Sequence, residues 1–368
     1  MCYFVYPCDL SPFMAGRATQ IDGLRAFGML GVACVHWLPR ETRGWVPFEL
    51  GLFFFLVLTG YLITGVLLRE RDRGEASGVA WRAYGLKNFQ VRRGLRILAP
   101  YYAAAAFALL LGARDIREAW GWYLTHTSNL HMAAHGWADF TSHFWTLAVQ
   151  QQFYVLWPFV IWWVPRRAMV PLLVGFSAVA PAFRLFDTEL AGRFVLPDLL
   201  PFAACDYLGL GSLLALAVHR GLPLSHPGLR RAGVAAFLAY AALYGLDQAG
   251  HPVPVLRAFQ QTFLTVACCG LIAAASVGFR GWRALLLEHP AIQHLGKLSY
   301  GLYLFHNLAP LAAGWICPWL WNGRFEHGLG FAARLGVFAL ISWALAWVSW
   351  RMLEVPAQGV KARMARNP

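Results

Sequence analysis

The stretch "GLFFFLVLTGYLIT", Gly51 to Thr64, decides the fold class. It contains no charged side chain, and it lies within an apolar segment, 46–68, whose length suits a helix across the roughly 30 Å hydrocarbon core of a bilayer. The segment therefore predicts a membrane helix. Small residues within it, Thr59 and Gly60, would let a neighbouring helix approach closely, and plain packing is a sufficient reason for their presence.

The whole chain has the composition of a membrane protein. Of its 368 residues 58% are apolar and only 13% are charged, and 17 are Trp. So few charges cannot cover the surface of a soluble protein of this length. We expect an all-α, polytopic membrane protein, because about ten segments can hold a membrane helix: 21–38, 46–68, 98–113, 144–164, 168–186, 199–218, 232–247, 255–278, 296–317 and 329–350.

The net charge of +13 is explained by membrane topology. With both termini in the cytoplasm, most of the Lys and Arg residues fall on cytoplasmic loops, as the positive-inside rule requires. We therefore expect no nucleic-acid partner. The predicted organisation is a cytoplasmic N-terminal segment (1–20), a transmembrane domain (21–350) and a basic cytoplasmic tail (351–368).

Cysteine and histidine spacings do not predict a metal site. The seven cysteines are scattered without a Cys-x-x-Cys pair, so we interpret them as small core residues, and no disulfide is indicated. His131 and His135 have the spacing of two ligands on a helix, but no carboxylate motif accompanies them.

The first predicted helix, "IDGLRAFGMLGVACVHW" (Ile21 to Trp37), contains a basic residue and an imidazole on one face. Arg25 and His36 are eleven residues apart, which places them about 16 Å apart along a helix axis and close to alignment around it. Ionisable residues inside a membrane are candidates for function. An Arg that reaches the headgroups and a hydrogen-bonded core His would produce the same pattern.

Three arginines lie close together in "NFQVRRGLRILAPYY", between the second and third predicted helices. Arg92, Arg93 and Arg96 are spaced as on a helix beside the inner membrane surface. Several guanidinium groups together suit phosphate, which they bind in bidentate pairs. An interfacial segment that contacts anionic lipid would need the same residues, and both interpretations stay open.

Three consecutive amides interrupt the apolar segment "HFWTLAVQQQFYVLWPF". Gln150 should lie in the outer half of its helix, at the depth of His36. A buried amide must be hydrogen-bonded, and an imidazole is an obvious partner. A hydrogen bond that merely joins two helices is the alternative.

A polar face is also predicted in "LGKLSYGLYLFHNLAP". Ser299, Tyr303 and His306 recur at positions i, i+4 and i+7, which lie on one side of a helix. A polar stripe inside a membrane helix faces protein or a cavity rather than lipid.

Five motifs in order resemble acyltransferase family 3, the membrane O-acyltransferases of bacterial surface glycans and some small molecules. They are "DGLRA…H", "FFLVLTGYLI", "RRGLRI…PYY", "FWTLAVQQQFYVLWP" and "LSYGLYLFH", and the resemblance spans about 20–310. It implies ten membrane helices in the bacterial cytoplasmic membrane. It also implies transfer of an acetyl group from cytoplasmic acetyl-CoA to a hydroxyl of an exopolysaccharide or a lipid-linked oligosaccharide outside.

On matching positions the resemblance implies roles for individual residues. His36 would be the general base that activates the acceptor hydroxyl, with Gln150 beside it. The residues implied in binding acetyl-CoA are Arg25, Arg92, Arg93, Arg96, Phe54, Phe55, Thr59 and Tyr154. Further residues of the substrate site would be Ser299, Tyr300, Tyr303 and His306. The scheme requires no metal.

Two positions depart from the pattern of the family. Phe53 stands where the family usually has Asp, and Gln150 stands where its fourth helix normally has Glu. A carboxylate at position 150 would orient the His36 ring and stabilise its charged form, as in hydrolase triads. We therefore expect this chain to be an impaired Glu-to-Gln variant at this position.

Two other functions fit the same residues. Arg25, His36 and His306 would also form the polar path of a transporter or flippase, although no repeated halves with interrupted helices are evident. An acyltransferase whose acceptor is a small molecule such as a macrolide would use the same chemistry as the glycan enzyme.

Overall fold

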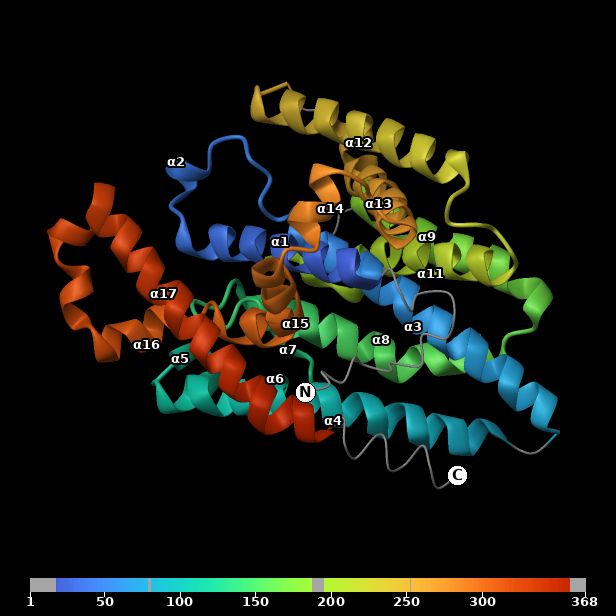
Figure 1. The fold of residues 1–368 in the computed structure, drawn as a ribbon, viewed down its shortest axis with the longest axis horizontal. Helices are drawn as coiled ribbons and strands as arrows, with labels where there is room; N and C mark the ends of the chain where they lie inside the picture. The colour runs from blue at the N-terminus through green and yellow to red at the C-terminus, as the bar shows by residue number, and fades with distance from the viewer. Residues whose placement is uncertain (1–17, 79–80, 187–194, 252, 358–368) are drawn as a thin grey trace.

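The computed structural model describes residues 18–78, 81–186, 195–251 and 253–357, and every regular element within these ranges is helical (Figure 1). Parts of the two predicted cytoplasmic ends, residues 1–17 and 358–368, lie outside the described residues. The predicted all-α class is confirmed for the described part of the chain.

In the part of the chain that the structure describes, the fold is carried by ten long helices: α1 (Ala18–Trp37), α3 (Leu50–Ser77), α4 (Trp81–Leu110), α8 (Phe144–Trp163), α9 (Met169–Leu185), α11 (Cys205–His219), α12 (Pro227–Gln248), α13 (Pro254–Val277), α15 (Pro290–Phe305) and α17 (Gly328–Ser349). Short helices join them: α2 (Arg40–Arg43), α5 (Arg114–Glu118), α6 (Trp120–Leu124), α7 (Ser128–His135), α14 (Trp282–Leu287) and α16 (Ala309–Ile316). The remaining elements are 3-10 turns at Arg166–Ala168, Pro197–Leu199, Pro201–Ala204, Pro318–Trp321 and Gly323–Phe325, and a π-helical turn at Trp350–Glu354.

Within the described residues, five helical segments are long and apolar enough to cross a membrane: Leu50–Ser77, Arg166–Leu185, Pro201–His219, Val255–Val277 and Gly328–Ala357. The chain is therefore a helical membrane protein. Each of the ten predicted segments coincides with helix, but the count of ten membrane spans stays a prediction, because the other helices are shorter or more polar.

Several predicted limits differ from the structure, among them the end of the second segment, because α3 continues past residue 68 to Ser77. The third segment was expected to begin at residue 98, whereas α4 begins at Trp81, because its first half is basic and amphipathic and hydropathy does not detect it. The ninth segment, expected at 296–317, is divided into α15 and α16. The chain turns between them, and Pro310 stands at the start of α16, where proline is tolerated because the first N–H groups of a helix have no partner within it.

Helix α3 lies in close contact with α1 and α11. A Cβ added at Gly51 would lie 2.1 Å from the carbonyl oxygen of Gly28 on α1, and one added at Gly60 would lie 2.2 Å from that of Leu208 on α11. These are backbone atoms that cannot move aside, so glycine is required at both places. The close packing expected at Gly60 is thus present, and it places α3 between the two helices.

Helix α3 ends and α4 begins at one edge of the molecule, away from α2 and α16 (Figure 1), and basic residues are frequent in the second half of α3 and the first half of α4. We call this region the basic end, and it contains Arg69, Arg71, Arg73, Arg82, Lys87, Arg92, Arg93 and Arg96. Part of it is structural. The buried guanidinium of Arg71 donates to the carbonyl oxygens of Ile161 and Val164 at the end of α8, at 2.7 and 2.8 Å, and pairs with Glu75.

A buried ion pair joins α9 to α11 and α13. Arg184 contacts the completely buried carboxylate of Asp206 at 2.8 Å, and the hydroxyl of Thr262 donates to the same carboxylate. Because the carboxylate also accepts from the backbone N–H of Tyr207, it is well supplied with hydrogen-bond donors. We interpret this pair as structural, since the buried carboxylate accepts hydrogen bonds from three other described residues.

Candidate active site

Three imidazole rings meet where α1 ends. The ring centroid of His36 lies 4.9 Å from that of His306, which follows α15, and 6.4 Å from that of His143, which precedes α8. His143 and His306 are themselves 4.9 Å apart. The side chains of His143 and His306 are 2% and 1% exposed, whereas His36 is half-buried. We call these three residues the histidine cluster.

The cluster unites two predicted residues with one that the sequence analysis did not select. His143 stands at the head of the quoted segment "HFWTLAVQQQFYVLWPF". Tyr303, also predicted, holds the cluster together: its hydroxyl donates to the His143 carbonyl oxygen at 3.1 Å and contacts the Thr146 hydroxyl. The i, i+3 spacing of His143 and Thr146 is the signal that would have identified both.

Gln150 belongs to α8 and is bonded to two other predicted residues, one of them on α3. Its Oε1 atom accepts hydrogen bonds from the Thr59 hydroxyl and from the Tyr154 hydroxyl, each at 3.3 Å. Among the described residues the structure shows no hydrogen bond between Gln150 and His36. The expected amide–imidazole bond is therefore not formed, and the bond to Thr59 instead joins α8 to α3, which is the alternative that the sequence left open.

Tyr154 connects Gln150 to the arginines of α4. The guanidinium of Arg93 lies 5.5 Å from the centre of the Tyr154 ring, a distance at which a cation interacts with an aromatic face. The Tyr154 carbonyl oxygen accepts from the side chain of Gln90, also on α4. Predicted donor-binding residues of α3, α8 and α4 thus form one continuous set of contacts.

The predicted arginines have acidic neighbours. Arg92 pairs with Glu70 of α3 at 2.7 Å, and the second carboxylate oxygen of Glu70 is buried with no hydrogen-bond partner in the described structure. Arg25 pairs with Asp22, one turn earlier on α1, at 2.8 Å. Glu70 was missed by the sequence analysis because it lies in an alternating run of charges that is also typical of a solvated helix end.

A second acid, Glu354, lies close to the other arginines. It ends the π-helical turn after α17, is 4% exposed, and its Oε1 atom is buried without a hydrogen-bond partner in the part of the chain described. The charges of Arg96 and Arg25 act on it. Because π-helical turns are frequent at functional sites, the turn is a further candidate for the donor site. The predicted span ended at 350, four residues too early to include it.

The remaining predicted residues lie on α3 and α15. The Phe55 ring is 6.4 Å from that of Tyr303, so Phe55 is beside the histidine cluster, while Phe54 is buried next to it. Ser299 is buried, and its hydroxyl has no partner among the described residues. The Tyr300 hydroxyl donates to the carbonyl oxygen of Ile97 on α4.

Phe53 stands where the family usually has Asp, and it belongs to a different part of the molecule. Phe53 stacks on Tyr207 of α11 with ring centroids 4.8 Å apart and planes inclined by 15°. In this chain the position therefore contributes to packing between α3 and α11.

No group of three His, Cys, Asp or Glu side chains in the described ranges is arranged to hold a metal ion. The rings of His131 and His135 stack 4.4 Å apart on α7, and Nδ1 of His135 lies 3.0 Å from the carbonyl oxygen of His131. Burial and the neighbouring His135 lower the pKa of His131.

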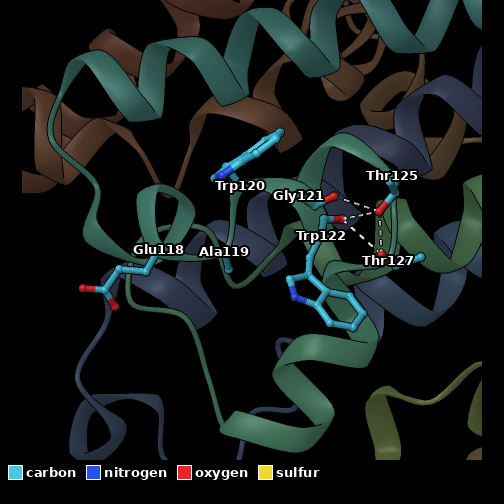
Figure 2. A pocket seen from close by; sticks show the side chains of 7 residues that line it. All are labelled: Glu118, Ala119, Trp120, Gly121, Trp122, Thr125 and Thr127. Atoms are coloured by element: carbon cyan, nitrogen blue, oxygen red, sulfur yellow. Dashed lines mark hydrogen bonds between the residues drawn. The ribbon is translucent and has the colours of Figure 1, made fainter.

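A shallow pocket of about 470 Å³ lies on the segment that joins α5 to α7 (Figure 2). The hydroxyl groups that line it make hydrogen bonds to the protein itself. The Thr125 hydroxyl bonds to that of Thr127 at 2.7 Å and to the carbonyl oxygen of Gly121 at 2.8 Å. Glu118 on its rim pairs with Arg114. The pocket contains none of the residues that the sequence analysis selected, and we do not assign it to the active site.

Known proteins with similar sequences are named as O-acetyltransferases, some of them provisionally. The chain is 22% identical over 323 residues to the peptidoglycan O-acetyltransferase OatA of Listeria monocytogenes. The aligned region covers 78% of this chain and 48% of OatA. It is 25% identical over 384 residues to SACOL0978 of Staphylococcus aureus (strain COL), named provisionally as an O-acetyltransferase, with 93% of this chain and 58% of the relative covered. YrhL of Bacillus subtilis, named provisionally as a peptidoglycan O-acetyltransferase, is 27% identical over 78% of this chain and 47% of its own length.

The chain thus spans about half the length of the curated relatives that it matches. No solved structure matches it. The family model described as an acyltransferase domain matches residues 19–351, which include every predicted site residue. The chain therefore belongs to acyltransferase family 3.

Proposed function

We propose that this chain is a membrane O-acetyltransferase that moves an acetyl group from cytoplasmic acetyl-CoA to a hydroxyl of a glycan on the other side of the membrane. One observation carries the proposal. Helix α1 bears Arg25 and, about 16 Å further along its axis, His36 in the histidine cluster. Such a distance suits a donor whose anionic end is held at one membrane surface while its thioester reacts near the other.

The basic end supplies groups for the anionic part of the donor. Guanidinium groups bind phosphate in charge-assisted, often bidentate pairs, and Arg92, Arg93 and Arg96 lie on consecutive turns of α4. Glu70 holds Arg92 in place from α3. In this proposal the basic end faces the cytoplasm of a bacterium, both termini lie on that side, and the protein resides in the cytoplasmic membrane.

The histidine cluster supplies the base. His36 removes the proton of the acceptor hydroxyl as its oxygen attacks the thioester carbonyl, the carbon–sulfur bond breaks, and the CoA thiolate leaves. The proton held by His36 then passes to the thiolate. The products are an O-acetyl ester and CoA with a free thiol. The names of OatA and YrhL support a glycan such as peptidoglycan as the acceptor.

Position 150 affects the efficiency of this reaction. Two hydroxyl donors converge on one oxygen of Gln150, an arrangement that a carboxylate would also accept, with the addition of a negative charge. We propose that the amide makes the chain a less active form of the enzyme.

The donor site is tested by binding. In Arg92→Gln one of the phosphate-binding charges is lost, and we expect the dissociation constant for CoA to rise about 10-fold or more, since a hydrogen bond to a charged group contributes about 1.5–3 kcal/mol. The matched control is Arg114→Gln, which removes an exposed arginine from the segment after α4 and should leave CoA binding unchanged. Unaltered CoA binding by Arg92→Gln would favour the lipid-contact interpretation of α4.

A further inference from the structure

Two rings of the histidine cluster have their protonated nitrogen fixed by the backbone. Nδ1 of His306 lies 2.8 Å from the carbonyl oxygen of Tyr303, and Nε2 of His143 lies 3.0 Å from that of Leu304. A carbonyl oxygen only accepts hydrogen bonds, so in the neutral rings each of these nitrogens carries the hydrogen. Nε2 of His306 and Nδ1 of His143 are therefore left with bare lone pairs.

Both bare nitrogens are buried, and neither has a hydrogen-bond partner among the described residues. Leaving a buried acceptor without a donor is unfavourable, so such groups generally have a reason to persist. The only other ring of the cluster, His36, is half-buried and lies closer to His306 than to His143. His36 can therefore meet a substrate, while the two buried rings lie behind it.

We infer that His306 is a positioning residue. It accepts a hydrogen bond from His36 once His36 has removed the proton from the hydroxyl group of the glycan. This inference rests on the proposed function. Nε2 of His306 would hold the charged His36 ring in place until its proton moves to the departing CoA thiolate. His143, 4.9 Å from His306, packs behind the pair.

No carboxylate is available for this task in the described cluster. Gln150, at the position of the family's Glu, is bonded to Thr59 and Tyr154. A neutral imidazole stabilises a neighbouring cation less than a carboxylate does, because it carries no net charge. The role of His306 is therefore compatible with a less active enzyme. It is also compatible with a faster acetyl transfer when position 150 carries a carboxylate.

The side chain of His306 can be changed without removing the local backbone contact. Trp37, next to His36, donates its indole N–H to the carbonyl oxygen of His306 at 2.9 Å, and this bond does not involve the imidazole. Two amide substitutions then separate the two ring nitrogens. Asn places its NH₂ near the position of Nδ1 and keeps the bond to Tyr303, whereas Gln places its carbonyl oxygen near the position of Nε2.

The test is the turnover of labelled acetyl-CoA by His306→Asn and His306→Gln. We expect His306→Asn to lower kcat about 100-fold or more, within the range known for general acid–base groups, with the KM for acetyl-CoA and the dissociation constant for CoA unchanged. His306→Gln should retain kcat within about 10-fold of the unmodified chain, because its oxygen replaces the acceptor lone pair. His131→Asn on α7 is the matched control and should behave as the unmodified chain.

Two results would overturn the inference. One is an unchanged kcat in His306→Asn. The other is an equal loss of kcat in both variants together with an equal loss of thermal stability, which would show that the ring only packs. Failure of the proposed function is distinguishable, because in that case the unmodified chain would bind no CoA or would transfer no acetyl group.

Discussion

At the residue scale, we propose that the amide of Gln150 lowers the activity of the site without changing its shape, because Gln and Glu differ by a single heavy atom. Its Oε1 atom receives two hydroxyl donors, Thr59 and Tyr154, and its NH₂ group takes no part in these bonds. Glu has the same size and would accept both bonds. Charge at this position is therefore the property that Glu in place of Gln150 would change.

Gln150→Glu should raise the rate of acetyl transfer by about 100-fold or more, by comparison with the about 10⁴-fold loss when a triad Asp becomes Asn. The measurement is turnover of labelled acetyl-CoA. Gln152→Glu is the control, because the Gln152 amide donates to the His126 carbonyl oxygen and to Asn129, and a carboxylate cannot donate. That variant should show no gain. If Gln150→Glu is no faster than the unmodified chain, position 150 is not an impaired catalytic position.

His126 makes the stability of the protein sensitive to pH. It is buried against Tyr101 with ring centroids 4.0 Å apart, and neither ring nitrogen has a hydrogen-bond partner in the described structure. Burial lowers its pKa from 6.5 to about 4. Between these values the unfolded chain binds more protons than the folded one, so the stability contributed by the neutral ring is complete above pH 6.5 and is lost as the pH falls towards 4.

We expect the thermal midpoint of the purified protein to fall between pH 6.5 and 4, and to fall less in His126→Asn. Asn tolerates the positive φ of 55° found at this residue and does not titrate. His135→Asn, which changes an exposed ring on α7, serves as the control and should keep the pH dependence of the unmodified chain. An equal fall in all three proteins would contradict the assignment to His126.

At the element scale, the contact of α3 with α11 depends on a glycine that faces a backbone carbonyl. Gly60→Ala should lower the thermal midpoint, because the new methyl group meets the Leu208 carbonyl oxygen and overpacking is unfavourable by about 1–3 kcal/mol. Gly65→Ala on the same helix is the matched control, since the nearest atom there is the movable end of Arg69 at 3.5 Å. A larger fall of the thermal midpoint in Gly65→Ala than in Gly60→Ala would show that the α3–α11 contact is described wrongly.

Apolar runs predicted the elements well wherever hydropathy alone defines a helix. The segment expected at 144–164 is α8, and that expected at 255–278 is α13, each within one residue at both ends. The prediction was wrong where a helix is basic, as at the start of α4, and where a polar pair such as His306 and Asn307 allows the chain to turn. Hydropathy describes the fit of a segment to lipid, and these residues instead contact other parts of the protein.

The candidate site was only partly predictable for a similar reason. Periodicity placed Arg25 and His36 on one face of α1, and it placed Tyr303 and His306 on one face of the helix that became α15. It could not show that His143 would join them, because the three rings come from the end of α1, the residue before α8 and the residue after α15. Glu70 and Glu354 were missed because their importance lies in the arginines of α4 that face them.

At the scale of the whole molecule, two chemically different regions lie apart. The basic end of α3 and α4 lies at one edge of the fold, and the histidine cluster lies where α1 ends (Figure 1). A carrier of anions would need the basic residues, and a soluble hydrolase would need only the imidazoles. A donor that is held at one surface and reacts near the other needs both regions in one chain, as the proposed acetyl transfer does.

The most direct test is acetyl transfer across the membrane of proteoliposomes, with the donor on one side and the acceptor on the other. Labelled acetyl-CoA is supplied only to the surface that exposes the basic end, and a glycan acceptor only to the other. We predict that the acceptor becomes labelled, and that His36→Ala abolishes labelling while the protein still binds CoA. Normal labelling by His36→Ala, or acceptor movement that does not depend on acetyl-CoA, would contradict the proposed function.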